Sequence, residues 1–338
     1  MATTKTEPVI RALDLGWGYT KYTVKNRSTG ALETASFPSL APRHAGMDLS
    51  LSIIGRRDTT IVSVEGTEYE VGPDSGDLES TDATRNLNDQ YIHTDQYRAL
   101  AYGAMHYMLE PVIDLLVVGL PLSGMANAEK LRAMLEGAHQ LNKHESVTVK
   151  EVLVLPQPLG GLYYCLSKGG SQPEFEFLKE EVNLVIDPGF LTFDFLLANG
   201  DRIVESRSSA HIGGVSKVLR AIADSISKKT GTVYDNLSAL DKGLRRRKVK
   251  INGVVEDLAE HIGNTRSILE GSVNYMKNIV GAGADVDNII LLGGGATVYQ
   301  KTIQAYYPKH AVITIDDGQM ANVKGFQLAG EAHTAGKR

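Results

Sequence analysis

The sequence contains a single cysteine, Cys165, so no intramolecular disulfide can form and a reducing compartment fits the chain. Long apolar runs are missing as well. The best of them, residues 111–122, is interrupted by Asp114 and is too short to span a bilayer. The first residues, MATTKTEP, lack the apolar stretch of a signal peptide. We therefore expect a soluble cytoplasmic protein without a membrane partner.

An excess of positive charge is also missing. The formal net charge of −5 argues against indiscriminate binding to nucleic acid, so we expect no direct nucleic-acid partner. The histidines at 139, 144, 211 and 261 show no metal-ligand spacing, and we expect no structural metal site. The composition is otherwise that of a globular protein, with 42% hydrophobic and 22% charged residues. A length of 338 residues predicts two domains.

Two stretches more than a hundred residues apart share one pattern. Residues 10–21 read IRALDLGWGYTK, and residues 182–195 read VNLVIDPGFLTFDF. Each begins as an apolar strand, ends that strand in Asp-x-Gly (at Asp14 and Asp187), and continues into a second strand. Each copy alone is also compatible with a plain turn between two strands. The duplication favours a phosphate-binding pair of loops in two halves that face one another across a nucleotide.

The residue types in these turns suit an anionic ligand. Glycine permits positive φ and close approach of the backbone, so that N–H groups can meet a phosphate. Lys21 adds a positive charge at the end of the first turn, and an aspartate can hold Mg²⁺ directly or through water. The alternative for Lys21 is a solvated lysine on a strand.

Strands alternate with helices along the rest of the chain, which predicts an α/β protein of two similar domains. We expect the first domain at 1–165 with a strand-rich insertion at about 38–93, and the second at 166–338 with an insertion at about 228–285. The C-terminal helix, from about residue 320, is expected to return to the first domain. Among the expected elements are a hairpin of Tyr22–Lys25 with Leu32–Phe37, helices over Thr94–Leu109 and Ala128–Leu141, and a strand over Val147–Leu155.

With these turns in place, the chain resembles the actin-like ATPase superfamily, over nearly its whole length. Within it, the nearest resemblance is to the ParM/StbA group of plasmid-partitioning actins, including the protein D component of PRTRC plasmid systems. The two phosphate motifs correspond to Asp14–Lys21 and Asp187–Asp194. Two connecting motifs resemble the segments 156–161 and 321–326, and the adenosine motif resembles 291–296. Five short motifs in the family's order make the resemblance specific.

The resemblance implies an actin-like, ribonuclease H-like duplicated fold with a nucleotide cleft between its domains, each domain carrying a small inserted subdomain. It implies that Asp14 and Asp187 face one another and hold Mg²⁺ through water, with ATP or ADP as the nucleotide and GTP as the alternative. Lys21 and the amides of 16–20 would bind the β-phosphate, and those of 189–192 the γ-phosphate. The implied nucleotide contacts are Asp14, Gly16, Trp17, Gly18, Tyr19, Thr20, Lys21, Gly189, Phe190, Leu191, Thr192, Asp194, Gly213, Gly214, Lys217, Gly293, Gly294, Gly295 and Ala296.

Several of these roles have a plain structural alternative. Trp17 can instead pack under its loop, and the glycines at 293–295 can form an ordinary strand-to-helix turn. Gln157 is the candidate for orienting the attacking water, with Asp187 as the other catalytic residue. Many partitioning actins carry Glu at the position of Gln157, which leaves the proton acceptor open. The alternative for Gln157 is a buried amide that caps the turn between two prolines.

The function implied by the resemblance is a filament-forming ATPase that separates plasmid copies through a DNA-binding adaptor at a centromere-like site. Self-assembly would use a head-to-tail interface that does not close on itself. The competing functions are an ATP-dependent kinase and a chaperone-type nucleotide switch of the same superfamily. The chain shows no candidate carboxylate base for a kinase outside the two phosphate loops, and no peptide-binding domain for a chaperone. The basic run 245–248 is either a solvated face or a contact with a subunit or the adaptor.

Overall fold

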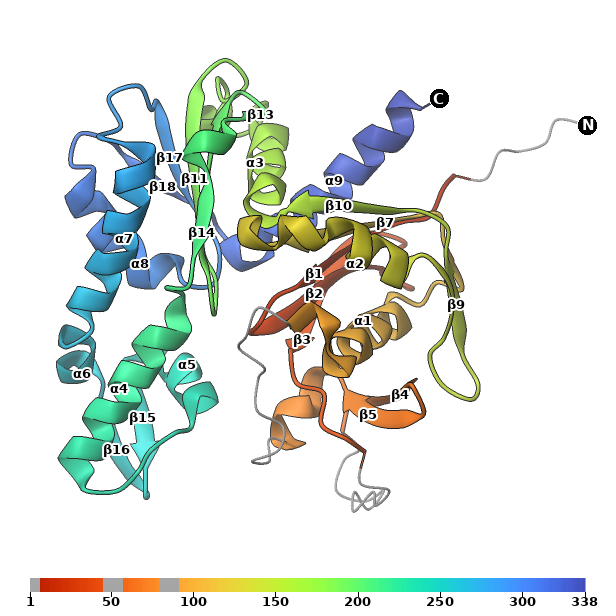
Figure 1. Cartoon of the computed structure of the whole chain (residues 1–338), viewed down its shortest axis with the longest axis horizontal. Helices are drawn as coiled ribbons and strands as arrows, with labels where there is room; N and C mark the ends of the chain where they lie inside the picture. Colours follow the sequence, from red (N-terminus) through yellow and green to blue (C-terminus); the bar gives the residue numbers. More distant parts are fainter. Residues whose placement is uncertain (1–6, 45–56, 79–90, 338) are drawn as a thin grey trace, which may run out of the picture. The chain divides into compact units, whose positions relative to one another are not determined.

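The computed structural model describes residues 7–44, 57–78 and 91–337. The chain divides into two compact units (Figure 1), of which unit 2 is Glu180–Asp316 and unit 1 combines Met1–Lys179 with Asp317–Arg338. The division follows Lys179, later than the boundary expected at 165/166. Parts of the expected insertion at 38–93, namely 45–56 and 79–90, lie outside the described residues. None of the described helices combines the length and apolar character that crossing a lipid bilayer requires.

Unit 1 is built on a five-stranded sheet in the order β10-β7-β1-β2-β3. The central strand β1 pairs antiparallel with β2 and parallel with β7. The antiparallel pairing of β2 with β3 confirms the expected hairpin. Parallel strands need crossover segments, which here carry the helices. The strands are β1 (Ile10–Leu15), β2 (Tyr19–Lys25), β3 (Leu32–Pro38), β7 (Leu115–Leu120) and β10 (Val152–Pro156).

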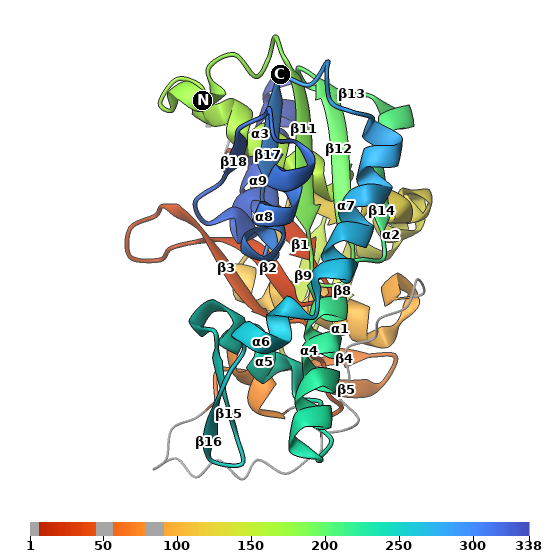
Figure 2. The same ribbon diagram turned by 90° about the vertical axis from the view of Figure 1, so that its left-hand side faces the viewer.

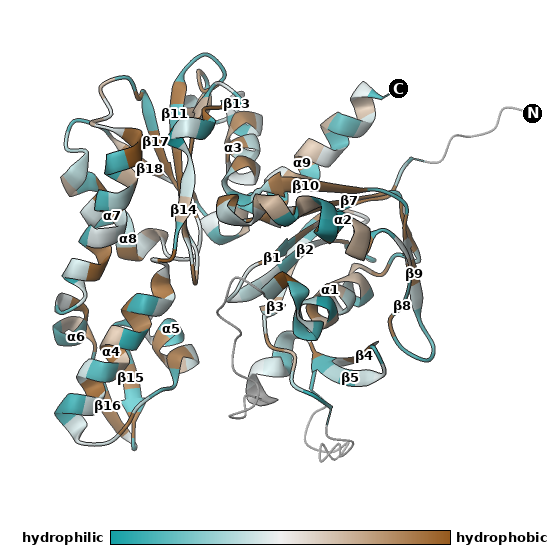
Figure 3. Ribbon diagram, in the orientation of Figure 1, coloured by the Kyte–Doolittle hydropathy of each residue, from teal (hydrophilic) through white to brown (hydrophobic). Residues whose placement is uncertain are grey.

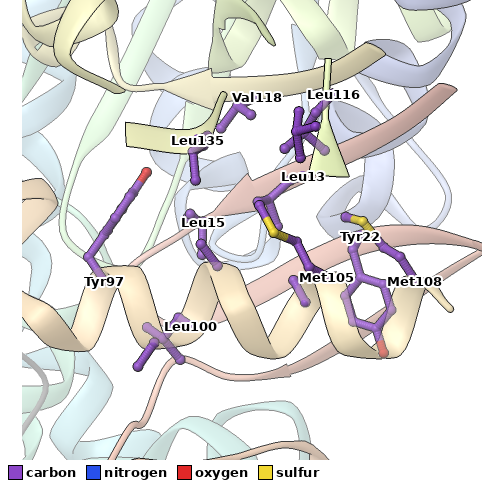
Figure 4. Close-up of a cluster of buried hydrophobic side chains, with 14 of the residues drawn as sticks. Leu13, Leu15, Tyr22, Tyr97, Leu100, Met105, Met108, Leu116, Val118 and Leu135 are labelled. Atoms are coloured by element: carbon purple, nitrogen blue, oxygen red, sulfur yellow. The ribbon is translucent and has the colours of Figure 1, made fainter. Parts of the chain in front are cut away.

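The two faces of this sheet are covered by different helices. Leu13 and Leu15 pack with the buried side of α1 (Asp95–Met108), as Figure 4 shows. Ala12 packs on the opposite face with residues of α9 (Ala321–Gly336). Because successive residues of a strand point to opposite faces, Asp14 lies on the same face as Ala12. Strand periodicity thus directs this carboxylate to the face that carries α9.

On that face, α9 crosses α3 (Gln157–Lys168) at two glycines. A Cβ at Gly325 would lie 1.7 Å from the carbonyl oxygen of Gly160. The backbone N–H of Gly161 donates to Asn322 Oδ1 at 3.1 Å. The two connecting segments recognised in the sequence, 156–161 and 321–326, therefore pack against each other backbone to backbone.

Unit 2 repeats the sheet plan of unit 1. Its central strand β11 pairs antiparallel with β12 and parallel with β17, in the order β13-β12-β11-β17-β18, with β14 beside β12. Equivalent strand order and direction in both units confirm the predicted α/β fold of two similar domains. The strands are β11 (Val182–Pro188), β12 (Phe193–Asn199), β13 (Arg202–Ile203), β14 (Ser209–His211), β17 (Asn288–Leu291) and β18 (Val312–Thr314).

Buried side chains of helices α4 (Val215–Thr230), α7 (Arg266–Val280) and α8 (Ala296–Tyr306) pack with those on one face of this sheet. Figure 2 shows the ribbons of these three helices. Alternating hydrophobic and hydrophilic bands are visible along α4 in Figure 3, as expected of a helix with one buried side. A smaller part of unit 2 contacts α4 and comprises α5 (Leu237–Arg246), α6 (Ala259–Gly263), β15 (Lys248–Ile251) and β16 (Val254–Asp257). The basic residues 246–248 are exposed at the end of α5 and the start of β15.

The sequence prediction fails around residue 137. The helix expected over Ala128–Leu141 ends at Leu135, because Gly137 adopts φ +107° and the chain continues as a strand. The strand expected over Val147–Leu155 is likewise two strands, β9 and β10. The remaining elements are β4 (Thr60–Val64), β5 (Thr67–Val71), β6 (Val112–Ile113), α2 (Ala128–Leu135), β8 (Gly137–Gln140), β9 (Ser146–Val149) and the 3-10 turns Pro73–Leu78, Tyr91–His93, Leu122–Asn127, Pro173–Phe175, Glu205–Arg207 and Gly318–Met320.

Candidate functional site

In unit 1, three of the predicted residues meet at the end of β1. Asp14 and Lys21 are direct partners in the β1–β2 ladder, and Lys21 Nζ donates to Asp14 Oδ2 at 2.8 Å. Gln157, the first residue of α3, donates from Nε2 to Asp14 Oδ1 at 2.7 Å. Asp14 is only 1% exposed. Both oxygens of this buried carboxylate therefore have a donor from the described side chains.

This cluster distinguishes between the alternatives for Lys21 and Gln157. Lys21 is not a solvated strand lysine, because its ammonium group is bonded to a buried carboxylate and its side chain is 13% exposed. The side-chain amide of Gln157 is bonded to Asp14, at the start of a helix, rather than capping the turn between the two prolines. Burying a charge is tolerated only when it is paired and hydrogen-bonded, and the carboxylate of Asp14 meets both conditions.

The turn between β1 and β2 is short, covering residues 16–18. Trp17 stacks on Tyr91 with ring centroids 4.2 Å apart and an interplanar angle of 23°, and it packs against the core of unit 1. This geometry favours the alternative in which Trp17 supports the loop from beneath. Positive φ was one of the two reasons expected for glycine in the turns, and it is wrong for Gly16, Gly18 and Gly189. The other reason, close approach of the backbone to a ligand, stays a prediction.

Sequence reasoning missed Ser39, which follows β3 and contacts this turn. Its backbone N–H donates to the carbonyl of Gly18 at 3.0 Å, and its hydroxyl donates to the carbonyl of Gly16 at 2.6 Å. Thr20, whose side chain is fully buried, lies with its hydroxyl oxygen 3.0 Å from that of Ser39. The available signal was the pairing of β2 with β3, which brings the end of β3 beside the start of β2.

In unit 2, the corresponding turn joins β11 to β12. Asp187 and Asp194 are direct partners in the ladder, as Asp14 and Lys21 are in unit 1, and both are buried. The turn closes through a hydrogen bond from Gly189 N–H to the carbonyl of Thr192 at 2.8 Å. The same aspartate position at the end of the central strand therefore occurs in both sheets.

The first turn of α4 is bonded to this second loop. The N–H groups of residues 214, 215 and 216 donate to the carbonyls of Leu191, Gly189 and Phe190 at 2.8, 3.0 and 2.7 Å. A Cβ at Gly214 would lie 2.6 Å from the carbonyl oxygen of Gly189, so glycine is required for this approach. These three amides thus brace the loop, and a role for Gly213 and Gly214 in nucleotide binding stays a prediction.

Lys217 lies exposed in the first turn of α4, and its backbone N–H donates to the carbonyl of Gly214 at 3.2 Å. Burial lowers the pKa of His211 below its ordinary value, and the nearby charge of Lys217 lowers it further. The position of Lys217 is compatible with an anionic ligand, and its contact with nucleotide stays a prediction.

A third loop, between β17 and α8, lies against the aspartate turn of unit 2. Gly293 has φ +84°, and a Cβ there would be 2.0 Å from Asp187 Oδ1. Gly295 donates from its N–H to the carbonyl of Pro188 at 2.9 Å, and a Cβ there would lie 2.7 Å from that oxygen. Gly294 is exposed and has open space where a Cβ would be. The predicted adenosine loop and the predicted second phosphate loop therefore pack against each other in unit 2.

The residue types in each unit, taken separately, suit a magnesium nucleotide. Unit 1 carries Lys21 beside the carboxylate of Asp14, and unit 2 carries the carboxylate of Asp187; carboxylate oxygens are hard ligands of the kind that Mg²⁺ prefers. Donors already bonded to both oxygens of Asp14 favour a contact with the metal through water. The other predicted contacts lie on the loops or strand ends just described: Tyr19 and Thr20 in β2, Phe190, Leu191 and Thr192 in the second turn, and Ala296 at the start of α8.

Two family models match this chain, one in each unit. The model for the N-terminal domain of actin-like proteins matches residues 12–160, and that for the C-terminal domain of MreB-like archaeal actin homologues matches residues 185–305. The chain belongs to the actin-like superfamily. No curated protein matches this actin-like chain significantly in sequence.

Solved structures agree with the actin-like fold. The archaeal actin homologue Ta0583 is 20% identical with a TM-score of 0.77, over 96% of this chain and 99% of that one. A 15-stranded ParM filament from Clostridium botulinum is 20% identical with a TM-score of 0.76, over 97% of this chain and 100% of that one. Apo pSK41 ParM is 20% identical with a TM-score of 0.64, over 97% and 98% of the two chains. At these identities the likeness is one of fold.

Proposed function

We propose that this actin-like protein binds ATP or ADP with Mg²⁺, hydrolyses ATP, and assembles into filaments whose turnover depends on the nucleotide. The observation that carries the proposal is the repeated Asp-bearing turn at the end of the central strand of each sheet, Asp14 in β1 and Asp187 in β11. Two family models, one in each unit, support it. The solved structures include Ta0583 in complex with ADP, at 20% identity and a TM-score of 0.74.

In this proposal the residues act by position and charge, as phosphoryl transfer requires. Lys21 and the amides of 16–20 would bind the β-phosphate, and the amides of 190–192 the γ-phosphate. The N–H of Gly189 is already bonded to the carbonyl of Thr192, so it is not among these donors. Asp14 and Asp187 are the carboxylates that would hold a magnesium ion, and the ion would supply positive charge for the phosphates. Gly293–Gly295 lie along the adenosine, close to the backbone of the second loop.

Gln157 and Asp187 are the proposed catalytic residues. The Nε2 group of Gln157 is bonded to Asp14, so its Oε1 is the atom that would accept a hydrogen bond from the attacking water. A neutral amide orients water well but is a poor base. Asp187 is the alternative candidate for the group that accepts the proton of the attacking water. GTP in place of ATP is compatible with the same phosphate contacts.

Assembly is proposed as head-to-tail self-association, an interface type that extends without closing. The solved structures similar in fold include the filament of ParM from Clostridium botulinum and an Alp12 filament. We further propose that the biological role is plasmid segregation through a DNA-binding adaptor. The sequence resemblance to the ParM/StbA group supports this role.

The test is phosphate release and sedimentation of the purified protein with MgATP, for wild type and two aspartate variants of unit 2. Asp187→Ala is expected to lower ATP turnover by about 100-fold or more, the scale of losing one preorganised charge-stabilising group. Its filaments should persist, because hydrolysis no longer destabilises them. Asp201→Ala, at an exposed turn, is the control and should match wild type. Unchanged turnover of Asp187→Ala, or no nucleotide-dependent sedimentation of wild type, would contradict the proposal.

A further inference from the structure

The first phosphate turn is held in place by one residue that no motif includes. Ser39, 5% exposed, bonds to the turn at three points: the carbonyls of Gly16 and Gly18 and the hydroxyl of Thr20. Gly16 and Thr20 bracket the turn, so a single side chain ties its two ends together. Ser39 itself carries no charge.

The hydrogens of this network can be assigned. A serine hydroxyl has one hydrogen, and that of Ser39 is directed to the carbonyl of Gly16, at 2.6 Å. The hydrogen between the two hydroxyls must therefore come from Thr20, at 3.0 Å. The result is a chain from Thr20 through Ser39 to Gly16, in which each donor is used once.

This chain fixes the direction of an amide in the turn. In a trans peptide the C=O and the following N–H point to opposite sides. Because Ser39 draws the carbonyl of Gly16 toward itself, the N–H of Trp17 points away from Ser39. The indole of Trp17 is held independently by its stacking on Tyr91. The peptide that joins Gly16 to Trp17 is thus restrained at two points, the hydrogen bond from Ser39 to its carbonyl oxygen and the stacking of the Trp17 indole on Tyr91.

We propose that Ser39 is a positioning residue, which orients the Trp17 amide and its turn toward the phosphates of the bound nucleotide. This inference rests on the proposed function of the turn. Ser39 acts only through the turn, so its loss should weaken the binding of nucleotides that carry a β-phosphate and leave the binding of adenosine unchanged.

The experiment compares Ser39→Ala with Ser39→Thr, which keeps the hydroxyl, and with Ser63→Ala, a half-buried serine of β4 in the same unit. Isothermal titration calorimetry measures the affinity for MgADP and for adenosine, and hydrogen–deuterium exchange follows the 16–20 amides without nucleotide. Ser39→Ala should weaken MgADP binding about 3- to 10-fold, the effect of one neutral hydrogen bond, with adenosine binding unchanged. The amides of 16–20 should exchange faster. Ser39→Thr should restore both measurements toward wild type, and Ser63→Ala should leave both unchanged.

Each outcome decides something. If exchange in the turn is unchanged in Ser39→Ala, the positioning role is wrong, whatever the nucleotide does. If MgADP and adenosine lose affinity equally, Ser39 supports the fold of unit 1 rather than the phosphate turn, and the inference fails. If wild type binds no MgADP while exchange still accelerates in Ser39→Ala, the proposed function fails and the phosphate role of Ser39 fails with it.

Discussion

Replacing Gly325 by alanine should destabilise unit 1, and the structure sets the size of the effect. The new Cβ would lie 1.7 Å from the carbonyl oxygen of Gly160, whereas real Cβ atoms keep at least 3.0 Å, so α3 and α9 must separate by roughly 1.3 Å. Overpacking of this kind costs about 3 kcal/mol, since no rotamer change relieves a clash between backbones. The higher helix propensity of alanine returns about 1 kcal/mol. The expected net loss is about 2 kcal/mol.

Urea unfolding followed by tryptophan fluorescence measures this loss in unit 1, because Trp17 is the only tryptophan of the chain. With a slope of about 2 kcal/mol/M, the midpoint should fall by about 1 M. Gly336→Ala is the control in the same helix, where an added Cβ meets nothing within 4 Å. A Gly325→Ala midpoint equal to that of Gly336→Ala would refute the reasoning that the helices cross in backbone contact.

Two further changes test the loop of unit 2 and an acidic group of unit 1. Gly293→Ala should abolish nucleotide binding, because its Cβ would lie 2.0 Å from Asp187 Oδ1 at a backbone φ of +84°. Gly271→Ala, in α7 with open space around the added Cβ, is the control and should bind as wild type does in the same titration. Hydrogen bonding from Lys150 is the main cause that holds the pKa of Asp114 below its ordinary value of 3.8. The stabilisation it gives is complete above pH 3.8 and is lost as the pH falls through the lower folded pKa. The urea midpoint of Asp114→Asn should therefore depend less on pH in this acid range than that of wild type. An unchanged dependence would show that Asp114 does not cause the loss of stability in acid.

Local patterns predicted those parts of the site that lie within one hairpin. The Asp-x-Gly turns and the apolar strands around them follow from alternation and turn chemistry over a few residues, so the pairing of Asp14 with Lys21 was accessible from the sequence. The contact of Gln157 with Asp14 was not, because it depends on how β10 and α3 place a residue 143 positions away. The sequence pattern predicted Asp14 and Gln157 as site residues but did not predict the contact between them.

Long-range packing also explains what the sequence analysis missed. The sequence analysis left two alternatives for Trp17, contact with nucleotide or packing under its loop, and it named no packing partner. The partner is Tyr91, which lies far along the chain. The helix expected over 128–141 had the right apolar spacing, yet it ends at Leu135, since Gly137 adopts a positive φ and the following residues pair as β8 with β9. Helical periodicity within 128–141 gives no information about β9, the strand that pairs with β8 and follows it in the chain.

The composition of unit 1 from two separate chain segments has a consequence for biosynthesis. Unit 2 is one continuous segment, but the face of the unit 1 sheet that carries Ala12 is closed by Val323 and Phe326 of α9. At about 5–20 residues per second, translation from Lys179 to Gly336, where α9 ends, takes roughly 10 to 30 s. During that interval most residues of unit 1 have been made, but the apolar sheet face that carries Ala12 is not yet covered by α9. This exposed face must not aggregate before α9 is made. Unit 1, whose first residues are made before any of unit 2, is thus completed only after unit 2, when α9 has left the ribosome.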